Sequence, residues 1–148
     1  MFLDDIKSLP KNQRIMGLDI GDSTIGIAIS DILQTIATPR ESYKRKKFTA
    51  DAEHIFKICS AEQIGAIVIG LPLNMDGTEG AKCQSVRQFG RNLLKVQDIP
   101  IYFQDERMST QAVTRTMRDA ELSTIRKTQV VDKMAASFIL QSALERVN

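Results

Sequence analysis

Apolar residues follow a strand-like pattern through the first quarter of the chain. Residues 15–20 and 25–30 are mostly apolar and flank a turn at 21–24, which predicts a hairpin. A third short strand is expected at 34–38, before Pro39, because proline is poorly tolerated inside a sheet. The sheet is therefore predicted to begin with three antiparallel strands.

The rest of the chain alternates helical patterns with buried strands. Apolar residues at helical spacing predict four helices, over 48–61, 79–96, 109–121 and 128–146. The apolar run at 66–71 and the stretch from Pro100 onward predict two parallel strands. The stretch 121–127, which joins the last two helices, is expected to be mobile. Together these elements predict an α/β fold, a five-stranded mixed sheet with helices on both faces.

Length and composition predict one soluble domain covering residues 1–148. The chain has 43% hydrophobic and 26% charged residues, which is close to the average for globular proteins. It contains no apolar run long enough to cross a bilayer, so no membrane association is expected. Asp4 and Asp5 stand where a signal peptide would carry basic residues, which favours a cytoplasmic protein.

The cysteines and the histidine argue against several kinds of catalysis. Cys59 and Cys83 lie in separate predicted helices without metal-ligand spacing, as expected of buried, reduced thiols. His54, the single histidine, falls on a different helical face from Cys59 and is expected at the surface. Zinc, thiol and serine-triad mechanisms are therefore disfavoured.

Acidic residues follow two of the predicted strands. Asp19 ends an apolar strand, where a charge is costly unless something binds it, although it could simply stabilise the following turn. Asp105 and Glu106 end the fifth strand. Because side chains alternate along a strand, only one of the two should face a site, while the other could cap the helix near Ser109. The sequence leaves open which one does.

A third acid, Asp132, is expected in the first turns of the last helix. Ala135 and Ala136 lie one turn further on and would leave room for a ligand, although Asp132 could instead interact with the helix dipole. Three converging carboxylates repel one another unless a divalent cation neutralises them. Oxygen ligands favour Mg²⁺ or Mn²⁺, and two such ions would support phosphodiester cleavage.

Basic residues gather around Tyr43, which indicates either a solvated loop or a surface that follows a phosphate backbone. They are Arg40, Lys44, Arg45, Lys46 and Lys47.

Four ordered blocks of the chain resemble the YqgF/RuvX family of Holliday-junction-resolvase-like proteins and pre-16S rRNA nucleases. The blocks are Met16–Asp31, Ile67–Gly80, Asp105–Thr110 and Val131–Gln141. The resemblance implies an RNase H-like fold, with catalytic, metal-binding acids at Asp19, Glu106 and Asp132. It also implies that the loop 70–77 lies beside the site, where Asn74 could touch substrate. The alternative for this loop is a turn closed by Pro72 and Asp76-Gly77.

The chain departs from the family pattern in the first hairpin. The family usually has a basic residue just before the Ile-Gly of that hairpin, whereas this chain has Ser23-Thr24. A phosphate contact is therefore expected to be missing. Arg107, Arg115 and the basic segment 40–47 are expected to hold the nucleic-acid backbone instead.

The acids predict a metal-dependent nuclease, and the resemblance implies that it acts on structured RNA, in maturation of the 5′ end of pre-16S rRNA. A Holliday-junction resolvase and a non-catalytic nucleic-acid-binding module are the alternatives. Junction cleavage would favour a symmetric dimer, and the sequence leaves monomer or homodimer open, as it does endo- or exonuclease action. An actin-like or sugar-kinase ATPase, suggested by Asp19-Ile-Gly-Asp-Ser-Thr, would need a second domain.

Overall fold

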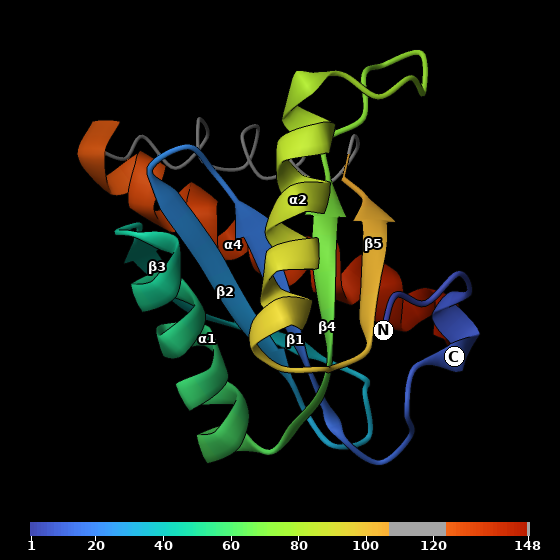
Figure 1. Cartoon of the computed structure of the whole chain (residues 1–148). Helices are drawn as coiled ribbons and strands as arrows, with labels where there is room; N and C mark the ends of the chain where they lie inside the picture. The colour runs from blue at the N-terminus through green and yellow to red at the C-terminus, as the bar shows by residue number, and fades with distance from the viewer. Residues whose placement is uncertain (107–123, 148) are drawn as a thin grey trace.

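Five strands form one mixed sheet in the computed structural model, which describes residues 1–106 and 124–147, with side chains for 1–106 and 133–147 (Figure 1). The strands are β1 (Arg14–Ile20), β2 (Thr24–Ser30), β3 (Ala37–Lys44), β4 (Ile64–Leu71) and β5 (Ile101–Asp105). Their order across the sheet is β3-β2-β1-β4-β5. The pairs β1–β2 and β2–β3 are antiparallel, and β1–β4 and β4–β5 are parallel, so the predicted mixed sheet is confirmed.

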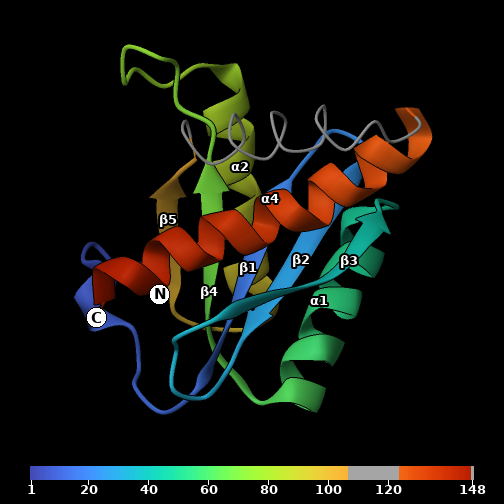
Figure 2. The same cartoon turned by 180° about the vertical axis from the view of Figure 1, so that it is seen from behind.

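Helices cover both faces of the sheet, as predicted. The helices α1 (Phe48–Glu62) and α2 (Ala81–Val96) lie on one face, and α4 (Thr124–Val147) crosses the other face (Figures 1 and 2). A short 3-10 helix, η1 (Ile6–Ser8), precedes β1. Within the described residues, no helix is both long enough and apolar enough to span a membrane.

Side-chain alternation along β1 divides the core into two layers. Met16 and Leu18 belong to the buried cluster beneath α1 and α2, whereas Ile15 belongs to the cluster beneath α4. Since successive side chains point to opposite faces, residues 17 and 19 face α4 as well. The strand therefore directs its terminal acid, Asp19, to the face that α4 covers.

A glycine in β1 allows α4 to lie close to the sheet. A Cβ atom at Gly17 would lie 2.7 Å from the Leu140 Cβ and 3.0 Å from the Ala136 carbonyl oxygen. Ala136 and Leu140 are both completely buried. Ala136, a small residue of the last helix, thus serves close packing against β1.

The prediction for the third strand was wrong in its bounds. β3 runs from Ala37 to Lys44, and Pro39 lies inside it, opposite Ala28 at a shift of register. β3 is an edge strand, and an edge strand tolerates proline because one side of its backbone has no neighbouring strand. Arg40 and Lys44 consequently belong to this strand and not to a loop.

The last helix begins earlier than predicted. α4 starts at Thr124, so residues 124–127 are helical, whereas they were expected to belong to the link between the last two helices. Asp132 lies two turns into α4 instead of in its first turns, where the helix dipole acts. The dipole explanation for this acid is therefore weakened. The predicted helix over 109–121, with Arg107 and Arg115, lies outside the described residues.

Replacing Gly17 by Ala tests the close packing of α4. The new methyl group would overlap the backbone and Cβ atoms of the helix, so Gly17→Ala is expected to destabilise the fold by about 1–3 kcal/mol. Urea denaturation measures this free energy. Ser85→Ala, on the exposed surface of α2, is the control, because it places no new atom in the core. Equal free energies of unfolding for the two variants would show that α4 does not pack closely against Gly17.

Candidate functional site

Asp19 lies at the carboxyl end of the central strand. It is paired across β1–β2 with Gly26, which holds its backbone in a regular ladder. Its side chain is half-buried on the α4 face. In sheets with parallel strands, ligand sites form at this edge, beyond the carboxyl ends of the strands.

Glu106 reaches the same face from the end of β5. Gln104, two residues earlier, donates to the Ser142 hydroxyl on α4 at 3.2 Å and accepts from Arg146 at 3.1 Å. The Glu106 N–H donates to the Leu71 carbonyl at 3.3 Å, which continues the pairing of β4 with β5. Alternation therefore directs Glu106 to the α4 face and Asp105 to the opposite one, which answers the question that the sequence left open.

The side chains of Asp19 and Glu106 meet above Gly70 of β4. They lie within hydrogen-bonding range of each other. A Cβ atom at Gly70 would overlap Glu106 Oε2 and lie 2.5 Å from Ile139 Cδ1, so only glycine leaves space for this carboxylate. Within the described structure, the buried Glu106 Oε2 has no hydrogen-bond partner.

Burial and like charge make Glu106 an unusual acid. Burial, together with the negative charge of Asp19 and the hydrogen bond to it, raises the pKa of Glu106 to about 7, against an opposing effect from Lys82. Near neutral pH, the pair is therefore poised between a shared proton and two negative charges. A cation bound between the two acids would remove this repulsion.

The donor set fits a divalent metal ion that prefers oxygen ligands. Two acids in contact, one with an orphaned buried oxygen, match the ligand preference of Mg²⁺ or Mn²⁺. Among the described side chains, no three acidic, histidine or cysteine residues gather as a metal cluster. The Asp132 side chain is outside that set, but its backbone lies in α4 one turn before Ala136, which packs on Gly17.

The loop after β4 is a closed turn at the same edge. The Gly77 N–H donates to the Asn74 carbonyl at 2.8 Å, and Gly77 adopts a φ of 89°, so the expected turn at Asp76-Gly77 is confirmed. The Asn74 side-chain amide donates to the Thr78 hydroxyl at 3.0 Å. Asn74 is exposed, and its contact with substrate stays a prediction.

Exposed lysines surround this edge of the sheet. Lys44, at the end of β3, pairs with Thr24 beside the β1–β2 turn, and Lys46 and Lys47 follow it. Lys82 lies in the first turn of α2. Other cations of the basic segments are neutralised, since Arg40 pairs with Glu62 at 3.0 Å and Arg87 with Glu79 at 2.7 Å.

Two helices also begin at this edge. Residues before α1 and α2, Lys47 and Gly80, form no side-chain cap hydrogen bond in the part of the chain that is described. Helix N-termini carry partial positive charge and attract phosphate groups. Sequence patterns missed Lys82 and Gly70, although a glycine within an apolar strand is a known signal of close approach.

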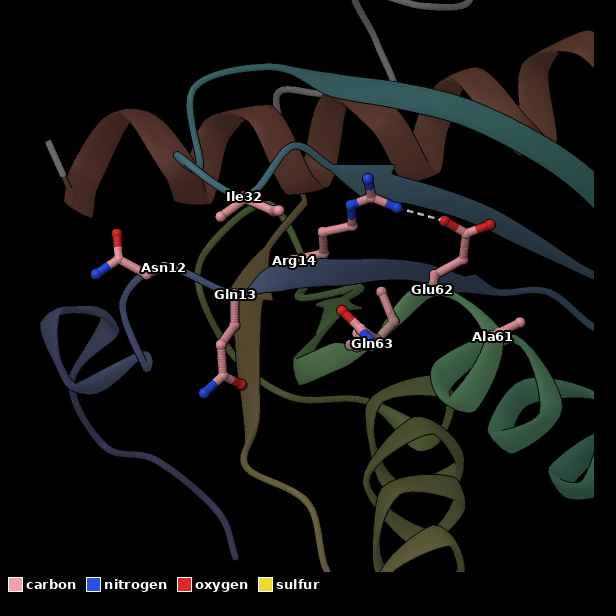
Figure 3. A pocket seen from close by; sticks show the side chains of 8 residues that line it. Asn12, Gln13, Arg14, Ile32, Ala61, Glu62 and Gln63 are labelled. Carbon is pink, nitrogen blue, oxygen red and sulfur yellow. Dashed lines mark hydrogen bonds and ion pairs between the residues drawn. The ribbon is translucent and has the colours of Figure 1, made fainter.

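A pocket at the opposite edge of the sheet lacks comparable chemistry. It has a volume of about 410 Å³ and lies beside Arg14, where β1 begins (Figure 3). Its one acid, Glu62, is bound by Arg14 at 2.6 Å and by Arg40. This pairing stabilises the ionised carboxylate and leaves little reason for it to bind metal.

The two thiols and the histidine take no part in the contact between Asp19 and Glu106. Both cysteines are buried and free, as predicted, and burial raises the pKa of Cys59 to about 12. His54 lies 2.9 Å from Glu41 and stacks on Tyr43 at a ring distance of 4.2 Å. A buried thiol with so high a pKa is a poor nucleophile.

Comparison with known proteins connects this geometry to nucleic-acid cleavage. The sequence model of a family described as "RuvX: Holliday junction resolvase" matches residues 13–146. A protein of Paramagnetospirillum magneticum is 51% identical over 140 residues, which cover 95% of this chain and 90% of that protein. One from Caulobacter vibrioides is 52% identical over 146 residues, covering 97% and 94% respectively. Both carry the name "Putative pre-16S rRNA nuclease".

The fold resembles that of a solved Holliday junction resolvase. The structure of T. thermophilus RuvC in complex with a Holliday junction substrate has a TM-score of 0.55 and 11% sequence identity. The match covers 92% of this chain and 96% of that one. The likeness concerns the fold alone, and it confirms the predicted RNase H-like class.

Changing Glu106 to Gln should stabilise the metal-free protein. The folded chain holds a proton on Glu106 up to about pH 7, whereas the ordinary pKa is 4.5. The stability linked to that proton is present below pH 4.5 and is lost as the pH rises through 7. In buffer with EDTA, Glu106→Gln should match the wild type near pH 4.5 and melt several degrees higher at pH 8, equivalent to about 2 kcal/mol.

Scanning calorimetry at both pH values measures this difference. Glu53→Gln, on the exposed surface of α1, is the control and should show no such dependence on pH. A Glu106→Gln variant that is less stable than the wild type at pH 8 would contradict the burial of an unpaired charge.

Proposed function

Since the chain belongs to the RuvX family, we propose that it is a metal-dependent nuclease whose active site lies where Asp19 and Glu106 meet. The proposal rests on one observation, the contact between these two acids with a buried, unpartnered oxygen on Glu106. A pair of acids in contact, one with a buried oxygen, costs folding stability, and the packing of the described core gives no reason for it. The names of the relatives support hydrolysis of phosphodiester bonds.

Asp19, Glu106 and Asp132 are the proposed ligands of Mg²⁺ or Mn²⁺. Asp19 and Glu106 would bind the ions from the ends of β1 and β5, and Asp132, a residue of α4, is proposed as the third ligand. Bound ions would activate water and stabilise the charge on the departing oxygen. Gly70 leaves the space that Glu106 occupies, and Ile139 of α4 lies beside that space.

The surrounding cations would hold the nucleic-acid backbone. Lys44, Lys46, Lys47 and Lys82 are exposed around the site and are proposed to contact phosphates. Arg107, Arg115 and Asn74 are proposed as further substrate contacts. Phosphate contacts orient a substrate without reading its sequence, so structure in the nucleic acid would determine where cleavage occurs.

Precursor 16S rRNA, cleaved in the cytoplasm at its 5′ end, is the proposed substrate, and the names of the relatives support it. A four-way DNA junction is the second candidate, favoured by the family description. Paired cuts in a junction would need a symmetric dimer with two sites, whereas RNA trimming could use a single copy.

Removing a proposed ligand should abolish cleavage without abolishing binding. Asp19→Asn and Asp132→Asn are each expected to reduce Mn²⁺-dependent cleavage at least 100-fold, because the ion loses a charged ligand. Binding of the nucleic acid, measured by fluorescence anisotropy in EDTA, should change less than threefold.

Asp98→Asn is the matched control. Asp98 is exposed and pairs with the N-terminus at 2.6 Å, at the end of the molecule where β5 begins. If Asp19→Asn cleaves as fast as this control, the proposed mechanism is wrong. A wild type that binds nucleic acid but never cleaves it would instead support a non-catalytic binding module.

The two substrates can be compared directly. With Mg²⁺ or Mn²⁺, the wild type is expected to cleave precursor 16S rRNA at least tenfold faster than a four-way DNA junction of equal concentration. Gel analysis of end-labelled substrates gives both rates and separates endonuclease from exonuclease products. Faster, symmetric cleavage of the junction would overturn the proposed substrate and leave the nuclease assignment intact.

A further inference from the structure

A second buried acid, Asp51, lies beside Arg45, which contacts the β1–β2 turn. Asp51 is in the first turn of α1 and is completely buried. Its Oδ1 accepts the Lys46 N–H at 2.8 Å, and it also hydrogen-bonds the side chain of Tyr43. Its Oδ2 lies 3.7 Å from Arg45 Nε and, among the described residues, has no hydrogen-bond partner. A buried carboxylate of this kind is costly and requires a cation beside it.

Arg45 connects Asp51 to the turn that follows Asp19. Its guanidinium Nη1 donates to the Gly21 carbonyl at 2.8 Å, and its backbone N–H donates to the Ser23 carbonyl at 2.9 Å. The turn itself is closed by the Gly21 N–H, which donates to the Thr24 carbonyl at 2.8 Å. Arg45 therefore contacts both sides of the turn from the position directly after β3.

The surroundings of Arg45 fix the plane of its guanidinium group. The group lies over the Phe89 ring at 5.3 Å, and 28% of the Arg45 side chain remains exposed. A planar guanidinium can stack on a ring while different nitrogens reach a carbonyl and a carboxylate, which an ammonium group cannot do. The three contacts together leave the group few alternative positions.

We infer that Arg45 is a positioning residue for Asp19, anchored by Asp51 and acting through the Gly21 carbonyl. The hairpin itself carries the uncharged Ser23-Thr24, and Arg45 brings a cation to the same turn from the position directly after β3. Gly21 is two residues from Asp19, so movement of the turn would move the Asp19 carboxylate. This inference rests on the proposed function, in which Asp19 binds the metal ion.

Changing Arg45 to Lys tests the inference while keeping the charge. Arg45→Lys is expected to weaken Mn²⁺ binding about tenfold, measured by isothermal titration calorimetry, because the turn loses the guanidinium hydrogen bond to the Gly21 carbonyl. The kcat should fall by a similar factor, with KM within twofold. Exchange of the Gly21 amide hydrogen, followed by NMR, should accelerate. Asp51→Asn is a second variant and should change all three measurements in the same direction.

Arg14→Lys is the matched control. Arg14 lies at the far end of the same strand as Asp19 and also pairs with a carboxylate, that of Glu62 at 2.6 Å. It should leave Mn²⁺ affinity, kcat and Gly21 exchange unchanged. Melting temperatures of all variants show whether any loss reflects unfolding, and Arg45→Lys tests the inference even if Asp51→Asn fails to fold.

The possible outcomes separate this inference from the proposed function. Unchanged Mn²⁺ affinity in Arg45→Lys would overturn the inference alone. A raised KM and a weaker salt dependence of binding, with normal Mn²⁺ affinity, would show that Arg45 contacts phosphate directly and would also overturn it. A wild type that binds no Mn²⁺ would overturn the proposed function and this inference with it.

Discussion

Two carboxylates, those of Asp19 and Glu106, lie against each other at the edge of the sheet, and one oxygen of Glu106 is buried without a partner among the described residues. Water would solvate these charges better than the protein does, so the arrangement costs folding free energy. The apolar layers on both faces of the sheet offset that cost. Such a deficit, in two acids that contact each other, is typical of a site that a ligand completes.

Regular features of the fold create this contact. Alternation along β1 and β5 directs both acids to the α4 face, and their strands flank β4, where Gly70 has no side chain to block them. Gly17 allows α4 to lie close to the sheet, so that Asp132 is carried on a helix packed against β1. On the other side, Asp51 and Arg45 support the turn after Asp19. Site and core therefore use the same strands.

Much of this fold was predictable because the spacing of apolar residues along the chain indicates which side chains are buried, and the buried side chains line the two faces of the sheet. The exceptions have physical causes. β3 tolerates Pro39 because it is an edge strand, and only the strand order reveals that position. The start of α4 has no apolar pattern that would mark it in the sequence. The choice between Asp105 and Glu106 required the register of β5. Sequence placed Arg45 only in a basic segment, either solvated or following a phosphate backbone, and did not single out Asp51, because their roles depend on contacts with Gly21 and Phe89 made only in the folded chain.

The central claim is that Asp19 and Glu106 form the two described sides of a cation site. A crystal of the protein soaked in Mn²⁺ and measured at the manganese absorption edge would locate the ion directly by its anomalous scattering. The account predicts an anomalous peak within about 2–2.5 Å of carboxylate oxygens from both residues. An ordered site with no peak between these acids, while their side chains still face each other at saturating Mn²⁺, would contradict it.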